Sequence, residues 1–247
     1  MLIKFICCDV FTRIACDLIS KSPHIIDVVF IPMLAHVEPD NLRELIRDEI
    51  AKTEESRRPY DAIVIGFGLC GNTVLGLTSS IEMVIPRAHD CCTMLMGSKE
   101  RFIEAFGHSL STRWCSTGYF ERTRAMRDYS SYISSQQDNY KTSAQYMRYV
   151  EEYDEETADY LWETLHPKIE TDETVYIRID GHEYSNSQET YIEDIEKLDL
   201  KVRVVDGDIS MLKALLDGDW DDERFLIVPP GKSIIGIYDM DIVMSAQ

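Results

Sequence analysis

Three apolar runs near the start of the chain each lead to a cysteine, and this arrangement constrains the fold more than any other feature. The first run ends at Cys7 and Cys8, the second enters a glycine-rich turn that carries Cys70, and the third enters a turn that carries Cys91. The runs occupy residues 2–6, 62–65 and 83–85. Short, continuous apolar runs are typical of strands that are buried on both faces of a sheet.

Helical patterns separate the first of these strands. Residues 12–20 carry apolar side chains at helical spacing, and a second helical pattern begins at Pro39-Asp40-Asn41. A further strand is predicted at residues 25–32. This order of strand, helix, strand, helix, strand predicts a parallel sheet with right-handed crossovers. Ligands of such sheets bind outside the carboxyl ends of the strands, which is where the three cysteines would lie.

The same alternation of strands and helices returns after residue 171. The sequence therefore predicts an α/β fold of parallel sheets flanked by helices, similar to a Rossmann fold, in two lobes. We expect an N-terminal α/β lobe that bears the cysteine turns at residues 1–110, an aromatic loop and helical excursion at 111–170, and a C-terminal α/β segment at 171–247 that completes a second lobe.

The charge of the chain bears on its partners. The formal net charge is -19 at pH 7, which argues against nucleic acid and anionic membranes as main partners. Residues 151–230 hold 24 acidic and 7 basic residues, whereas the first 150 residues are close to neutral. Two interpretations stay open for the acidic part, which is either a solvated surface that aids solubility or a docking face for a basic partner.

The seven cysteines favour reduced thiols over a disulfide framework, since their number is odd and their spacing is unlike that of small secreted scaffolds. No apolar run approaches the roughly 20 residues that a membrane-spanning helix needs. The N-terminus begins as a strand without the features of a signal peptide. We therefore expect a cytoplasmic protein, and the sequence leaves open whether it forms a homo-oligomer.

Cys8, Cys70 and Cys91 are candidate ligands of one metal site, with His89 as a fourth candidate. A single cysteine is usually a small buried hydrophobe, so the hypothesis depends on the common edge that the fold predicts for all three. Three thiolates, or two with His89, would leave a position open on zinc, the arrangement of a catalytic site. Three thiolates would also hold an iron–sulfur cluster with one iron free. The sequence does not separate these two alternatives.

Two glycines and an arginine near the cysteines are candidates for ligand binding. Gly68 and Gly71 would let the backbone approach a ligand closely, and Arg87 would bind a carboxylate or phosphate of a substrate. The spacing of Gly66, Gly68 and Gly71 formally matches a dinucleotide fingerprint. That fingerprint belongs at the first strand of its unit and needs an acidic residue after the next strand, so we do not expect a nucleotide.

The order of several motifs resembles the domain of unknown function 1638 family. The segments that carry the resemblance are Cys-Cys-Asp at 7–9, residues 39–42, 68–71, 86–91, 97–98 and 215–220, and Pro-Pro-Gly at 229–231. The resemblance implies an anaerobic setting and an association with corrinoid-dependent methyl transfer in one-carbon metabolism. It also implies that Cys8 and Asp9 match the conserved cysteine and acid of the first strand. Residues 107–118 depart from the family pattern.

These observations lead to three hypotheses for function. The first is a metal protein, with zinc or an iron–sulfur cluster, that transfers a methyl or sulfur group and holds an anionic substrate with Arg87. The second is a non-catalytic accessory or carrier protein for a corrinoid protein or a metalloenzyme. The third is a metal-free protein that binds a small-molecule ligand and has cysteines in its core.

Overall fold

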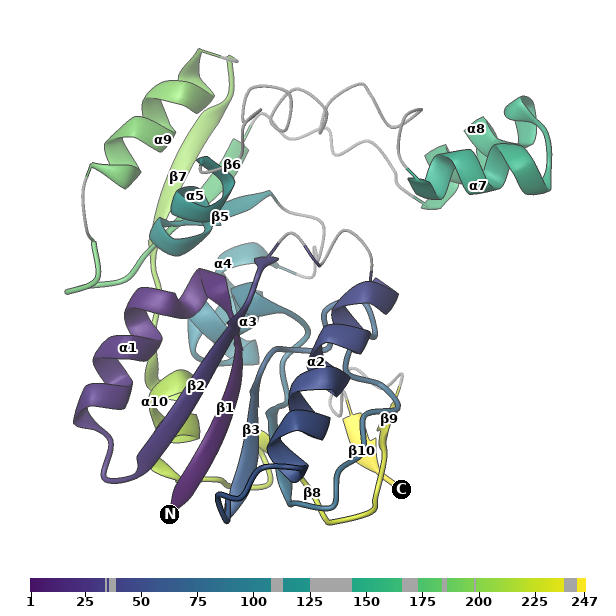
Figure 1. Cartoon of the computed structure of the whole chain (residues 1–247). Coiled ribbons are helices and arrows are strands. Elements are labelled where there is room, and N and C mark those ends of the chain that lie inside the picture. Colours follow the sequence, from purple (N-terminus) through teal and green to yellow (C-terminus); the bar gives the residue numbers. More distant parts are fainter. Residues whose placement is uncertain are drawn as a thin grey trace.

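A computed structural model shows a mixed α/β protein with two parallel sheets flanked by helices, which confirms the predicted fold class (Figure 1). The structure describes residues 1–33, 35, 39–107, 113–124, 144–165, 173–183, 186–197, 199–237 and 244–247. In this part of the chain no helix is long and apolar enough to cross a membrane.

The first sheet has five strands in the order β2-β1-β3-β4-β8. The strands are β1 (Leu2–Cys8), β2 (Ile25–Ile31), β3 (Ala62–Gly66), β4 (Met83–Pro86) and β8 (Phe225–Val228). The first four strands run parallel, as their apolar runs predict, and β8 adds an antiparallel edge. In the register of the sheet Cys8 pairs with Ile31 and Cys7 pairs with Gly66.

The predicted helical patterns form helices in which most apolar positions are buried, with Leu45 of α2 as an exposed exception. The helices that accompany the first sheet are α1 (Thr12–Lys21), α2 (Pro39–Glu54), α3 (Cys91–Met96), α4 (Lys99–Phe106) and α10 (Ser210–Asp217), with a short 3-10 turn, η1 (Asp9–Phe11), after β1. Leu42, Ile46 and Ile50 of α2 lie one helical turn apart and are all buried. The helical period in the sequence therefore identifies the core-facing side of α2 correctly.

The second sheet has three parallel strands in the order β5-β6-β7. They are β5 (Trp114–Ser116), β6 (Glu173–Arg178) and β7 (Lys201–Asp206), and α5 (Thr117–Arg124) and α9 (Ser187–Glu196) accompany them. This sheet has its own small core, which includes Cys115, Phe120, Tyr176, Tyr191 and Ile195.

The chain crosses between the two sheets more often than the predicted segments imply. β5 comes from the segment expected to be an excursion, yet it pairs with β6 of the second sheet. β8, expected with the second lobe, instead pairs with β4 of the first sheet, and it is followed by the hairpin of β9 (Ile234–Gly236) and β10 (Met244–Ala246). Short strands such as these carry no local signal of their partner, because pairing is decided by tertiary packing.

The carboxyl ends of strands from the two sheets face each other. The carbonyl of Val10, just after β1, lies so close to Gly118, just after β5, that an added Cβ would be 1.9 Å from its oxygen. The Nε of Arg122 donates to the carbonyl of Asp9 at 3.1 Å, and the amide of Asp208, after β7, donates to the carbonyl of Leu95 at 2.8 Å. We call this contact region the junction. The cysteine turns at the end of the first sheet therefore lie on the side that faces the second.

Candidate functional site

Cys8 is the last residue of β1, and its position is fixed by the residue that follows it. The Oδ1 atom of Asp9 accepts a hydrogen bond from the amide of Met33 at 2.8 Å, which ties the end of β1 to the chain after β2. The carboxylate of Asp9 also lies 3.5 Å from the guanidinium of Arg122 in α5, one of the helices that accompany the second sheet. Cys8 itself is fully buried. Asp9 therefore serves as an anchor between elements at this edge.

Cys70 lies in the turn after β3 and has an unusual backbone conformation. Its φ angle is 45°, in the left-handed region that residues other than glycine seldom adopt. The hydroxyl of Thr73 donates to the carbonyl of Cys70 at 2.7 Å, and the amide of Cys70 donates to the carbonyl of His89 at 2.9 Å. A strained residue of this kind costs on the order of 1 kcal/mol, persists only when its surroundings hold it, and is often found at functional sites.

The turns after β3 and β4 are packed directly against each other. The amide of Leu69 donates to the carbonyl of Ala88 at 2.8 Å. A Cβ atom at Gly68 would lie 2.8 Å from both the carbonyl oxygen of Ala88 and the amide nitrogen of Asp90. Only glycine fits there, because the neighbouring atoms are backbone and cannot rotate away. Gly68 therefore has a clear packing role, and its predicted contact with a ligand stays a prediction, as does that of Gly71.

Cys91 is the first residue of α3, and Asp90 fixes the start of that helix. The Oδ1 atom of Asp90 accepts hydrogen bonds from the amide of Thr93 at 2.9 Å and from its hydroxyl at 3.1 Å, a typical N-cap. The carboxylate of Asp90 is thus occupied by the helix end. The imidazole of His89 is half-buried and makes no hydrogen bond or ion pair with other described residues.

The three predicted cysteines meet at this edge. Cys91 shares hydrogen bonds with the thiols of Cys70 and Cys8, and these contacts, together with burial, raise the pKa of the Cys91 thiol well above its usual value. Cys8 and Cys91 are buried, whereas Cys70 is half-exposed. Cys91 is therefore a protonated thiol at neutral pH, and one of its two thiol partners, Cys70, is open to solvent.

The donor set suits a soft metal, although the side chains are not placed around one. Among the residues that the structure describes, no group of three or more His, Cys, Asp or Glu side chains is arranged as a metal site. Three cysteine thiols, two of them in contact with the third, are nevertheless the donors that zinc and iron–sulfur clusters prefer. Binding would require the cysteine side chains to turn from contact with one another toward a common centre about 2.3 Å from each sulfur.

The other sequence candidates have structural contacts. The Nε of Arg87 donates to the carbonyls of Asp222 at 2.9 Å and Phe225 at 3.3 Å, and Nη1 donates to the carbonyl of Met244. Arg87 therefore fastens the C-terminal segment to the end of β4, and its role toward an anionic substrate stays a prediction. His36 follows the second predicted strand and is a weaker candidate for lining the same crevice; it lies outside the described residues.

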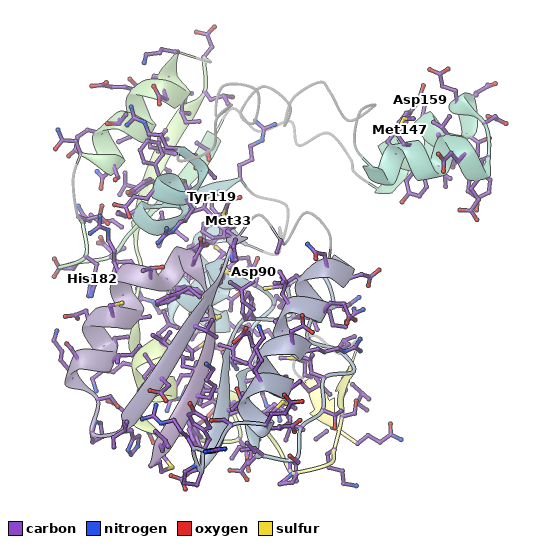
Figure 2. All side chains as sticks on the ribbon, viewed as in Figure 1. Met33, Asp90, Tyr119, Met147, Asp159 and His182 are labelled. Atoms are coloured by element: carbon purple, nitrogen blue, oxygen red, sulfur yellow. The ribbon has the colours of Figure 1, made fainter. Side chains whose placement is uncertain are left out.

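The sequence gives no indication of the second lobe's contribution to this region. Tyr119 packs against both hydrophobic cores, and its ring lies 5.2 Å from that of Trp114. Figure 2 shows Tyr119 and Met33 between the two sheets, above Asp90. A cavity at the junction is lined from both lobes, by residues that include Val10, Thr117 and His182. A pattern within one strand cannot reveal such contacts, because they join residues more than a hundred positions apart.

Fold and site together define a class of protein, namely α/β proteins in which two parallel sheets meet by their carboxyl ends and the first sheet presents a cluster of cysteines. The model of the family described as Protein of unknown function (DUF1638) matches residues 30–216. The chain belongs to this family, as the resemblance of its motifs implies. Searches of curated proteins and of solved structures found no match.

Proposed function

We propose that this chain is a metal-binding protein in which Cys8, Cys70 and Cys91 bind zinc or an iron–sulfur cluster, with His89 as a fourth candidate ligand. The observation that carries the proposal is the contact of Cys91 with both other thiols. The three cysteines lie in or against the apolar core of the first sheet, but they come from the ends of three different strands, and Cys91 contacts both of the others. The strained backbone of Cys70 supports the proposal further.

The open, half-exposed position of Cys70 favours a reactive centre over a purely structural one. A metal held by three thiolates would act as a Lewis acid or lower the pKa of a bound thiol, which suits transfer of a methyl or sulfur group. In the protein itself, the turns would orient the ligands and the second lobe would limit access of water from the opposite side. The assignment to anaerobic one-carbon metabolism rests on the family resemblance alone.

Two other functions remain as alternatives. A non-catalytic accessory or carrier protein would hold the same metal and pass it to a corrinoid protein or a metalloenzyme. A metal-free ligand-binding protein would use the same edge of the sheet for a small molecule. In each case the seven cysteines, all free thiols, suit the reducing cytoplasm.

The test is elemental analysis and an ultraviolet–visible spectrum of protein purified without oxygen. Wild-type protein should contain about one equivalent of zinc without colour, or iron with a broad brown absorbance. The single variants Cys8→Ser, Cys70→Ser and Cys91→Ser should contain much less metal than the wild-type protein. Cys115→Ser is the matched control, because Cys115 is also a buried free thiol but lies in the core of the second sheet.

The outcomes separate the hypotheses. Loss of metal in the three variants with the fold retained supports a functional metal site, and loss of both metal and folding indicates a structural one. A protein that contains no metal, and that takes up neither zinc nor iron with sulfide when these are added to the reduced protein, contradicts the proposal and leaves the ligand-binding alternative.

A further inference from the structure

The helices α7 (Ala144–Glu152) and α8 (Glu155–Leu165) form a hairpin that is separate from both sheets (Figure 1). The hydroxyl of Tyr146 donates to Oδ1 of Asp159 at 2.7 Å across the pair. Among the hairpin side chains that the structure describes, Tyr146 and Ala158 are buried. Asp154 begins α8 as its N-cap, since its Oδ1 accepts the amide of Thr157 at 2.7 Å. The hairpin is thus a defined unit with its own contacts.

The hairpin is too small to bury its apolar side chains by itself. The helices have 9 and 11 residues, and isolated helices shorter than about 12–15 residues are marginal in water. Within the described part of the chain, each of the two packs most closely against the other. Met147, Tyr153 and Tyr160 are 47%, 54% and 68% exposed. Large side chains of this kind on a protruding element are typical of an interface.

The charge of the hairpin indicates what kind of surface it would contact. Its 22 residues include seven acidic side chains and a single basic one, Arg148. The acidic side chains at the end of α7, in the turn and at the start of α8 form an exposed run with Tyr153 among them. That run consists of Glu151, Glu152, Asp154, Glu155 and Glu156. A second copy of this chain is a poor occupant, because two such hairpins would repel each other and each chain carries a net charge of -19.

We propose that the α7–α8 hairpin is a docking element for another protein, whose surface presents lysine and arginine side chains around an apolar groove. Tyr153, Tyr160 and Met147 would enter the groove, and the acidic run would pair with the basic rim. This is the helix-in-groove mode of recognition with complementary charges. The proposal is independent of the metal site, because none of these residues lies near the cysteine turns.

The test uses the whole protein and a defined probe in place of the partner. The probe is a synthetic amphipathic helix with leucine on one face and lysine on the other, labelled for fluorescence anisotropy. One control peptide has glutamate in place of every lysine, and another keeps the lysines but has serine in place of every leucine. The protein variants are Tyr153→Gln with Tyr160→Gln, and Glu151→Gln with Glu152→Gln and Glu156→Gln. Glutamine keeps a good helix propensity in both.

We expect the leucine–lysine peptide to bind wild-type protein and both control peptides to bind more weakly. The tyrosine variant should weaken binding by about tenfold or more, because aromatic anchors carry much of the binding energy of such interfaces. The glutamine triple variant should weaken binding and flatten its dependence on salt. The matched control is Ile25→Gln with Leu45→Gln, which removes two exposed apolar side chains outside the hairpin and should leave binding unchanged.

Two outcomes would overturn the proposal. Equal binding of all protein variants would show that the peptide is attracted by the net negative charge of the whole chain and does not dock on the hairpin. Wild-type protein that sediments as a dimer, and becomes a monomer when Tyr153 and Tyr160 are replaced, would identify a second copy as the occupant. Hydrogen exchange of residues 144–165 gives a check that needs no variant, because docking of the peptide should slow exchange there and leave the first sheet unaffected.

Discussion

The carboxyl ends of the two parallel sheets face each other, yet they are equipped in opposite ways. At the first sheet, Cys91 contacts the thiols of Cys70 and Cys8, and Cys70 holds a strained backbone. At the second sheet, the hydroxyl of Thr117 donates to Oε2 of Glu183 at 2.8 Å and lies 2.9 Å from the hydroxyl of Tyr176.

The polar groups of the second edge satisfy one another. Oε1 of Glu183 accepts the amide of Ile179 at 3.0 Å, and the hydroxyl of Tyr176 lies 3.3 Å from Oε2 of Glu183. Burial raises the pKa of Tyr176, so this hydroxyl stays protonated and serves as a donor. A saturated network of this kind stabilises a fold, whereas thiols are weak hydrogen-bond partners. The carboxyl ends of the second sheet thus stabilise the fold, whereas those of the first sheet, we propose, bind a metal.

The largest effect that this comparison predicts is on metal affinity. Replacing Cys91, the thiol common to both contacts, by serine should lower the affinity for zinc or cadmium by more than about a hundredfold, since even residues outside the ligand shell can account for 10–100-fold. Competition with a chromophoric chelator under reducing conditions measures the change. Cys115→Ser, in the second lobe, should bind as tightly as wild type. An equal loss of metal affinity in both variants would show that the metal does not bind specifically at the cysteine cluster of the first edge.

The next effect concerns the contact between the edges. Gly118→Ala places a Cβ atom against the carbonyl of Val10, so backbone must move and the free energy of unfolding should fall by about 2 kcal/mol. Urea denaturation measures the change. Gly181→Ala is the control, because an added Cβ there meets no atom within 4 Å and only the positive φ of 74° opposes it, at about 1 kcal/mol. If the two variants are equally stable, the lobes do not pack at Gly118 as described.

The sequence predicts the first edge well and the second poorly, for a physical reason. Apolar runs that end at Cys8, Cys70 and Cys91 define buried parallel strands, and parallel strands have their carboxyl ends at one edge. β5 has three residues in an aromatic, polar segment, so nothing local indicates that it joins β6. The pairing of β8 with β4 likewise cannot be predicted from the sequence, because the partner of an edge strand depends on tertiary packing.

Side-chain contacts were harder still to predict than strands. The common edge of Cys8, Cys70 and Cys91 is predictable, because each follows the end of a buried parallel strand. The sequence predicts that Arg87 binds a substrate beside them; its guanidinium contacts the backbone carbonyls of Asp222, Phe225 and Met244, and the role toward a substrate stays a prediction. An arginine has several rotatable bonds, so its sequence position leaves open where its charge lies.

A third prediction concerns protons. The contacts with Cys70 and Cys8 and burial keep Cys91 protonated in the metal-free protein at neutral pH, whereas a metal-bound thiolate carries no proton. Metal binding should therefore release protons, and affinity should rise with pH by up to about tenfold per pH unit for each proton released. Calorimetry in buffers of different ionisation enthalpy counts the protons. The expected number falls by one in Cys91→Ser, and a count of zero in wild type would contradict thiol coordination.

The smallest effect is expected at the second edge. Tyr176→Phe removes one hydroxyl from the network, but Thr117 and Glu183 keep their direct hydrogen bond, so no buried group is left without a partner. The free energy of unfolding should fall by only about 1 kcal/mol, and metal affinity should not change. Urea denaturation and chelator competition on the same variant test both statements. A tenfold loss of metal affinity without loss of stability would show that the second edge takes part in the chemistry of the first.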